Sequence, residues 1–251
     1  MKKILILNPP GRKHRFKKYE DFNGWVNRER DINAYNYISF PYYLCQLIQY
    51  LRDNIKDVEI DLLDARIEFF DQQRTIDKIK QYDPDILAVA IGCYTADIDK
   101  EYLDLDCVTV GFFSPSSTPA IDAVKNYNLK GNYIIQGDPE PVLKKIIDIE
   151  LNFAHHQLDE ILTMGTVRVV AIKEGIDYSD LPLAKYHEIL NMERYLNFST
   201  TCDYSYKRKW FNPNDRYVYL WHQEGCPFKC TFCQYSLLPF SRKTPKQIFE
   251  E

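Results

Sequence analysis

Long apolar runs are missing from this chain of 251 residues, since no segment approaches the roughly 20 consecutive apolar residues that a membrane-spanning helix needs. The N-terminal segment MKKILILNPPG also reaches Pro9, Pro10 and Gly11 too early to contain the apolar core of a secretory leader. Repeats and low-complexity tracts are absent as well. These absences predict a cytoplasmic protein with no membrane partner, and the apolar share of 45% is enough for a large core.

A strong net charge is lacking too. The formal charge of −4 creates no overall field that would attract nucleic acid. Two short basic runs, residues 12–18 and 206–210, are interpreted as solvated loops, although aromatic residues accompany the second run as they do in single-strand binders. A nucleic-acid partner is therefore not expected.

Cysteine is scarce but concentrated. Seven cysteines, an odd number without a leader, favour metal or redox chemistry over a disulfide framework. Three of them, Cys226, Cys230 and Cys233, fall in the stretch EGCPFKCTFC, a spacing expected by chance in about 0.006 of chains with this composition. The other four are interpreted as small core residues: Cys45, Cys93, Cys107 and Cys202.

The cysteine motif lacks the fourth ligand of a structural zinc site, which takes four protein ligands. His222 is the nearest candidate, so a zinc site that includes this histidine stays open as an alternative. An iron-sulfur cube held by only three thiolates instead leaves one iron open to another ligand. The predicted strand 217–221 precedes the motif, and this places the cysteines in a loop at the carboxyl end of a strand, where barrel enzymes keep their chemistry.

The first 150 residues alternate apolar runs with amphipathic stretches. The pattern predicts strands at 4–7, 58–64, 85–92, 107–113 and 132–137, and helices at 41–52, 74–82, 97–105, 117–127 and 140–151. Five such alternations favour a doubly wound parallel sheet of the Rossmann or flavodoxin-like kind, with any ligand at the carboxyl ends of the strands.

Turn residues follow these predicted strands. Gly92, Gly111 and Gly137 are assigned to tight turns that need a positive φ. Asp64 and Glu140 lie at strand ends, where they could touch a ligand or simply cap the elements.

The pattern divides the chain into three parts. Residues 1–154 form the predicted α/β domain, and residues 155–216 form a linker with one further strand near 167–172 and a short helix. Residues 217–251 contain the strand, the cysteine loop and the first turn of a helix that begins at Thr244 and Pro245.

The motif Cys-x3-Cys-x-aromatic-Cys resembles the cluster loop of radical S-adenosylmethionine enzymes. The resemblance implies that Cys226, Cys230 and Cys233 hold a 4Fe-4S cluster, and that Phe232 lies near the adenine of S-adenosylmethionine. It also implies an electron donor such as flavodoxin or ferredoxin. In that family, reductive cleavage of S-adenosylmethionine gives a 5′-deoxyadenosyl radical that abstracts hydrogen from a substrate, and the cofactor carries this chemistry. The resemblance does not name the substrate of this chain.

The N-terminal part is similar to the radical S-adenosylmethionine subclass that carries a cobalamin-binding-like domain, such as relatives of magnesium-protoporphyrin monomethyl ester cyclase. Cobalamin is therefore a candidate second cofactor. Two departures weigh against it. His14 has the wrong spacing for a lower axial ligand, and the fourth strand ends in Gly111, Phe112 and Phe113 instead of two glycines. The two phenylalanines are expected to fill the cleft where a corrin would lie. The stretches that carry the similarity are ILILNPP, FPYYL, DLLDA, PDILAVAIG, NYIIQGDPEPVL and LPLAKY.

Only the first strand, the cluster loop and the start of one helix of a radical S-adenosylmethionine barrel are expected after residue 216, whereas a complete barrel takes about 250 residues. We therefore expect catalysis to need further barrel units, for example from a second chain that completes the barrel. The alternative is a non-catalytic binding or scaffold module whose cysteine loop is vestigial or holds zinc.

Overall fold

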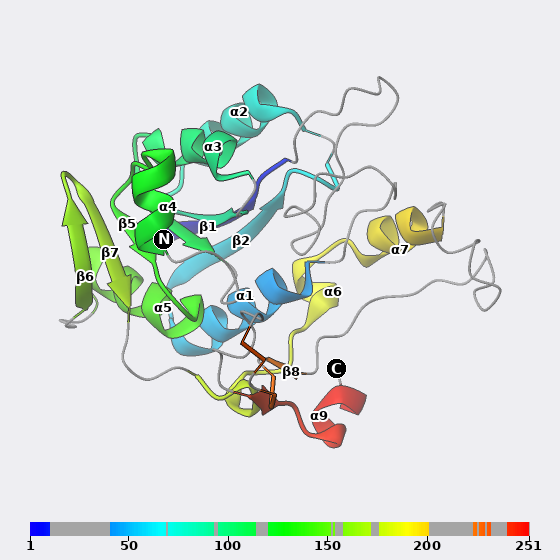
Figure 1. Ribbon diagram of the computed structural model, residues 1–251. Coiled ribbons are helices and arrows are strands. Elements are labelled where there is room, and N and C mark those ends of the chain that lie inside the picture. The colour runs from blue at the N-terminus through cyan, green and yellow to red at the C-terminus, as the bar shows by residue number, and fades with distance from the viewer. Residues whose placement is uncertain are drawn as a thin grey trace.

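A seven-stranded sheet with helices on both faces forms the centre of the computed structural model (Figure 1). Six strands run parallel, and β6 at one edge pairs antiparallel with β7. The predicted α/β class and Rossmann-like sheet are thereby confirmed. The structure describes residues 1–10, 41–68, 70–92, 95–113, 120–151, 153, 158–171, 176–200, 223–224, 226–228, 230–231 and 240–250.

The strand order in the sheet is β2-β1-β3-β4-β5-β7-β6. Because β1 lies between β2 and β3, the chain changes direction across the sheet at β1, and the carboxyl ends next to such a point are where ligands of open α/β sheets bind. The strands are β1 Lys2–Asn8, β2 Val58–Asp64, β3 Ile86–Ile91, β4 Val108–Phe113, β5 Tyr133–Ile135, β6 Asp159–Met164 and β7 Val167–Ala171.

Helices cover both faces of the sheet, each over its own apolar core. Helices α1 and α5 pack on one face, while α2, α3, η2 and α4 pack on the other (Figure 1). All six residues of β3 are buried, as expected for a parallel strand that is covered on both sides. The helices are α1 Tyr42–Asn54, α2 Gln72–Tyr82, α3 Ala96–Asp99, the 3-10 helix η2 Lys100–Asp104, α4 Ala120–Tyr127 and α5 Pro139–Glu150.

The linker forms a further layer over α1. It contains the 3-10 helix η3 Tyr178–Asp180, α6 Tyr186–Ile189 and α7 Met192–Thr200. The sequence predicts only one apolar stripe on α1, yet Gln46 and Gln49 on this helix are buried too. The backbone N–H of Lys185 donates to Gln49 Oε1 at 3.3 Å, and linker side chains join the core on this face. The linker is therefore packed against the α/β domain where it covers α1.

The sheet continues past residue 154, the boundary that the sequence predicts for the α/β domain. Strand β7 pairs with β5 in parallel, with Tyr133 opposite Arg168, and β6 pairs with β7. The strand predicted near 167–172 is confirmed, whereas the sequence does not predict β6. Strand β6 keeps Thr163 and Met164 exposed, so it lacks the continuous apolar run of a strand that is buried on both faces.

The glycines at the strand ends have different roles. Gly137 has a φ of 93°, which confirms the predicted tight turn. Gly111 instead lies inside β4, and a Cβ placed on it would come within 2.6 Å of Ile91 Cδ1 and 2.7 Å of Ile134 Cδ1. The prediction that Gly111 serves a turn is therefore wrong, because Gly111 lies inside the strand without a positive φ and is packed against side chains of the two neighbouring strands.

We expect Gly111→Ala to lower the free energy of unfolding by about 1–3 kcal/mol, the usual cost of inserting a methyl group into a filled core. Urea unfolding of the variant measures this loss, with an alanine replacement of the half-exposed Met164 as the surface control. An unchanged unfolding midpoint for Gly111→Ala would show that the two isoleucines move aside at no cost.

None of the helices in the described part of the chain is long and apolar enough to span a bilayer.

Candidate functional site

The cysteine loop starts from a short strand and ends at another. Strand β8 Gln223–Glu224 pairs antiparallel with β9 Ser241–Arg242, so the two ends of the 225–240 loop are held side by side. Helix α9 Pro245–Glu250 follows and confirms the predicted helix start. The strand predicted at 217–221 lies outside the described residues.

Two of the three predicted ligands are described. Cys226 is half-buried and Cys230 is exposed, and neither takes part in a disulfide. Cys233, Phe232 and His222 lie outside the described residues. Within the described part of the chain, no three metal-ligating side chains lie close enough together to hold a metal ion. Cys233 is not among the residues that this finding covers.

The remaining cysteines differ from those of the loop. Cys45 is fully buried, and burial followed by the nearby Asp64 carboxylate raises its pKa. Cys107 is half-buried, and burial raises its pKa to about 11. Both stay protonated at neutral pH, which suits the predicted role as small core residues and not that of metal ligands. Cys93 and Cys202 lie outside the described residues.

A capping box starts helix α9. Thr244 Oγ1 and the backbone N–H of Thr244 donate to Gln247 Oε1 at 2.9 and 2.7 Å, and Gln247 N–H approaches Thr244 Oγ1 at 3.3 Å. Such a reciprocal pair satisfies backbone N–H groups that would otherwise lack a hydrogen-bond partner at the start of the helix. The helix nevertheless buries none of its side chains, and Phe249 is 92% exposed.

A second group of polar residues lies at the carboxyl ends of β1 and β2. Asn8 Nδ2 donates to Asp64 Oδ1 at 3.0 Å, and the hydroxyl of Tyr195 on α7 donates to Asp64 Oδ2 at 2.6 Å. The backbone N–H of Arg66 donates to Asp64 Oδ1 at 3.1 Å, and the Arg66 side chain is buried beside it. We call Asn8, Asp64, Arg66 and Tyr195 the Asp64 cluster.

Burial controls the ionisation of the Asp64 cluster. It raises the pKa of Asp64, against the opposing effects of the Arg66 charge and of the hydrogen bonds. Burial and then the Asp64 carboxylate raise the pKa of Tyr195. The phenol therefore stays protonated and acts as a hydrogen-bond donor at neutral pH.

The sequence singled out Asp64 as a strand-end carboxylate but missed its main partner. Tyr195 is 131 residues away in the chain and comes from a linker helix, so no local pattern connects the two residues. Glu140, the other predicted strand-end carboxylate, is buried in the first turn of α5.

A pocket of about 300 Å³ adjoins the Asp64 cluster, between the carboxyl half of β2 and helices α6 and α7. Asp64 and Tyr195 contribute to its wall, which also includes the ion pair between Arg194 Nη1 and Glu68 Oε1 at 2.5 Å. Arg194 and Glu68 are thus paired with each other, and we assign no ligand to the pocket.

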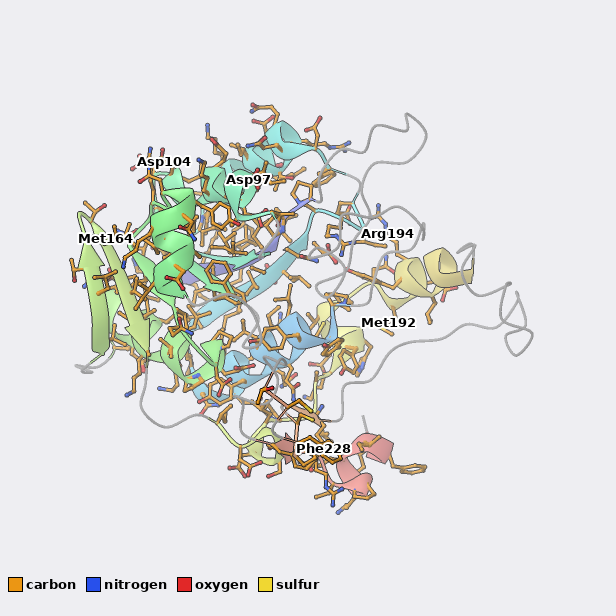
Figure 2. All side chains as sticks on the ribbon, in the orientation of Figure 1. Asp97, Asp104, Met164, Met192, Arg194 and Phe228 are labelled. Carbon is orange, nitrogen blue, oxygen red and sulfur yellow. The ribbon has the colours of Figure 1, made fainter. Side chains whose placement is uncertain are left out.

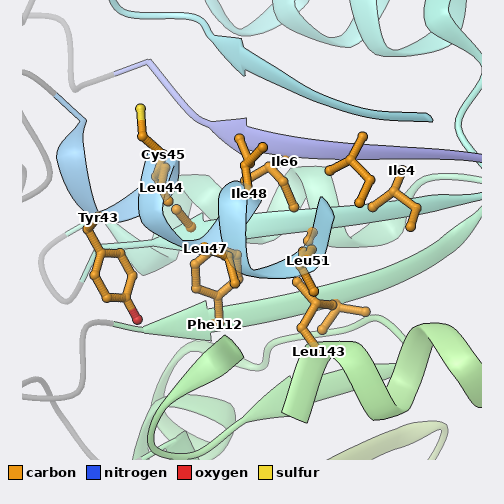
Figure 3. Close-up of a cluster of buried hydrophobic side chains, with 14 of the residues drawn as sticks. Ile4, Ile6, Tyr43, Leu44, Cys45, Leu47, Ile48, Leu51, Phe112 and Leu143 are labelled. Atoms are coloured by element: carbon orange, nitrogen blue, oxygen red, sulfur yellow. The ribbon is translucent and has the colours of Figure 1, made fainter. Parts of the chain in front are cut away.

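The carboxyl end of β4 is filled by side chains. Phe112 is fully buried in the core on the α1 side, and Phe113 is 5% exposed in the core on the opposite face. Figure 3 shows Phe112 among the side chains that α1 directs toward the sheet. Gly111, in the same strand, is packed against the side chains of Ile91 and Ile134 in the two neighbouring strands.

The chain was also compared with known proteins. No family model, no curated protein and no solved structure matches it.

Proposed function

We propose that this chain is a radical S-adenosylmethionine protein whose cysteine loop binds a 4Fe-4S cluster. The observation that carries the proposal is the spacing of Cys226, Cys230 and Cys233 in a loop whose two ends are joined by the pairing of β8 and β9. The pairing of β8 and β9 holds the two ends of this loop side by side. The accessible positions of Cys226 and Cys230 agree with this role.

The proposed ligands suit the group chemically. Three thiolates hold iron-sulfur clusters, and a site with three protein ligands leaves one iron for a substrate. When bound, the cluster would supply the electron for cleavage of S-adenosylmethionine to methionine and a 5′-deoxyadenosyl radical. Cys226, Cys230 and Cys233 would hold the cluster, and Phe232 would stack near the adenine. Flavodoxin or ferredoxin is the proposed electron donor in the cytoplasm.

Catalysis is proposed to need additional strand-helix units, supplied for example by a second chain. Helix α9 buries no side chain, and its Phe249 is 92% exposed. Phe228 of the cysteine loop, labelled in Figure 2, is 71% exposed. Apolar side chains on a barrel helix normally pack against neighbouring units. The exposure of Phe249 on α9 therefore supports the packing of further strand-helix units against this helix.

Cobalamin is not part of the proposed function. Phe112 and Phe113 occupy the carboxyl end of β4 on both faces of the sheet, and Gly111 is packed against side chains of both neighbouring strands. The residues present thus do not fit a corrin at this position.

The competing proposal is a non-catalytic binding or scaffold module whose loop holds zinc or no metal. Anaerobic reconstitution with iron and sulfide, followed by metal and sulfide analysis and an absorption spectrum, separates the two. The radical S-adenosylmethionine proposal predicts about four iron atoms per chain and broad absorption near 400 nm, whereas zinc is spectroscopically silent. Recovery of about one zinc per chain and no sulfide would favour the binding module.

A further inference from the structure

The cysteine loop is tied to a distant turn of the linker. Ser241 in β9, the strand that closes the loop, donates its hydroxyl to Asp177 Oδ1 at 2.7 Å. Asp177 immediately precedes η3 and is 64 residues away from Ser241 in the chain. One end of the loop is thus fixed to the linker as well as to β8.

A second contact joins the same turn to helix α9. Gln247 Nε2 donates to the backbone carbonyl of Ser179 at 2.7 Å. The oxygen of the same amide, Oε1, is the acceptor in the capping box with Thr244. Gln247 therefore starts the helix and docks it on η3 with one side chain.

Hydrogen bonds to other parts of the chain also fix the turn that contains Asp177. The backbone N–H and the hydroxyl of Ser179 donate to Asp177 Oδ1 at 2.8 and 2.7 Å. The backbone N–H of Ile176 donates to Asp138 Oδ2 at 3.2 Å, and Asp138 lies between the end of β5 and the start of α5. Hydrogen bonds from Ser241 and Ser179 lower the pKa of Asp177 to about 2, so its carboxylate is charged at neutral pH and accepts from both donors.

These contacts form a continuous path from the sheet to the loop. It runs from the carboxyl end of β5 through Asp138 to Ile176, and from Asp177 to Ser241. A ladder of two residue pairs such as β8 and β9 is marginal by itself, and closing the 225–240 loop costs chain entropy. The contacts with η3 supply restraint that the short ladder lacks.

We propose that Asp177 is a positioning residue for the cysteine loop, and that through it the α/β domain sets the geometry in which the loop binds its cluster. This inference rests on the proposed function for the cluster itself. It gives the α/β domain a defined task that requires no cobalamin.

The test compares Asp177→Ala and Ser241→Ala with Asp177→Asn and with Asp180→Ala in the full chain. Asparagine keeps an oxygen that accepts from Ser241, and Asp180 is an exposed carboxylate of the same turn. Hydrogen exchange of the peptide covering 240–250, alkylation rates of Cys226 and Cys230, and the electron paramagnetic resonance spectrum of the reduced, reconstituted protein are measured for each variant.

We expect exchange in the 240–250 peptide to accelerate roughly threefold or more in Asp177→Ala and Ser241→Ala, the effect of losing one exposed hydrogen bond. The same two variants should alkylate faster and show a broadened or shifted cluster spectrum with less iron. Asp177→Asn and Asp180→Ala should match the wild type.

Unchanged exchange in both alanine variants would overturn the positioning role. A wild-type cluster spectrum in Asp177→Ala, despite faster exchange, would also overturn it while leaving the proposed function intact. If the wild-type chain itself takes up no cluster, the proposed function fails, and the exchange and alkylation data alone then decide whether the α/β domain orders the loop.

Discussion

Asp64→Ala is expected to lower the free energy of unfolding by about 3–5 kcal/mol, because removal of one member of a buried, hydrogen-bonded charge cluster leaves the others without compensation. The change removes the acceptor for Asn8 Nδ2, for the Tyr195 hydroxyl and for the Arg66 backbone N–H. Chemical denaturation at neutral pH measures the loss. Asp122→Asn, at an exposed carboxylate of α4, should stay within about 0.5 kcal/mol of the wild type.

Asp64→Asn separates charge from hydrogen bonding. The asparagine oxygen still accepts a hydrogen bond from Asn8. The free energy of unfolding should therefore fall less than in Asp64→Ala, by about 1–2 kcal/mol at neutral pH. Burial raises the pKa of Asp64 above its ordinary value of 3.8, so the folded state binds the proton more tightly than the unfolded state does. Wild-type stability relative to Asp64→Asn should therefore rise as the pH falls from neutral through the raised pKa toward 3.8. A difference that shrinks with falling pH would show that the Arg66 charge, not burial, dominates at this site.

Cys226→Ala is expected to abolish cluster binding, from about four iron atoms per reconstituted chain to less than about one, since two remaining thiolates do not hold a cube. Cys107→Ala is the matched control, because this thiol is half-buried and its raised pKa of about 11 keeps it protonated. Iron and acid-labile sulfide assays on the reconstituted variants measure the effect. Iron that persists in Cys226→Ala and disappears in Cys107→Ala would assign the cluster to a different set of ligands.

Much of the sheet was predictable because its elements are local patterns. The fully apolar segment 86–91 and the alternation of strands with helices predict β3 and its parallel neighbours, and the structure confirms them. Strand β6 was missed, because an edge hairpin needs no continuous apolar run. Gly111 was misassigned, because close packing between neighbouring strands leaves no mark in the adjacent sequence.

The candidate site was predictable only where its chemistry is contiguous in the chain. The spacing of Cys226, Cys230 and Cys233 is a local signal. The partners that surround the loop are not, because Asp177 meets Ser241 across 64 residues and Tyr195 meets Asp64 across 131. Such contacts depend on how the linker folds back over α1, which periodicity does not encode.

We propose above that the cysteine loop holds a cluster with an open iron that S-adenosylmethionine binds. The most direct test is electron paramagnetic resonance of the anaerobically reconstituted and reduced protein, recorded with and without S-adenosylmethionine. We expect a 4Fe-4S signal whose g values shift when S-adenosylmethionine is added. A signal that S-adenosylmethionine leaves unchanged, or no signal from protein that folds normally, would contradict the account and favour the binding module.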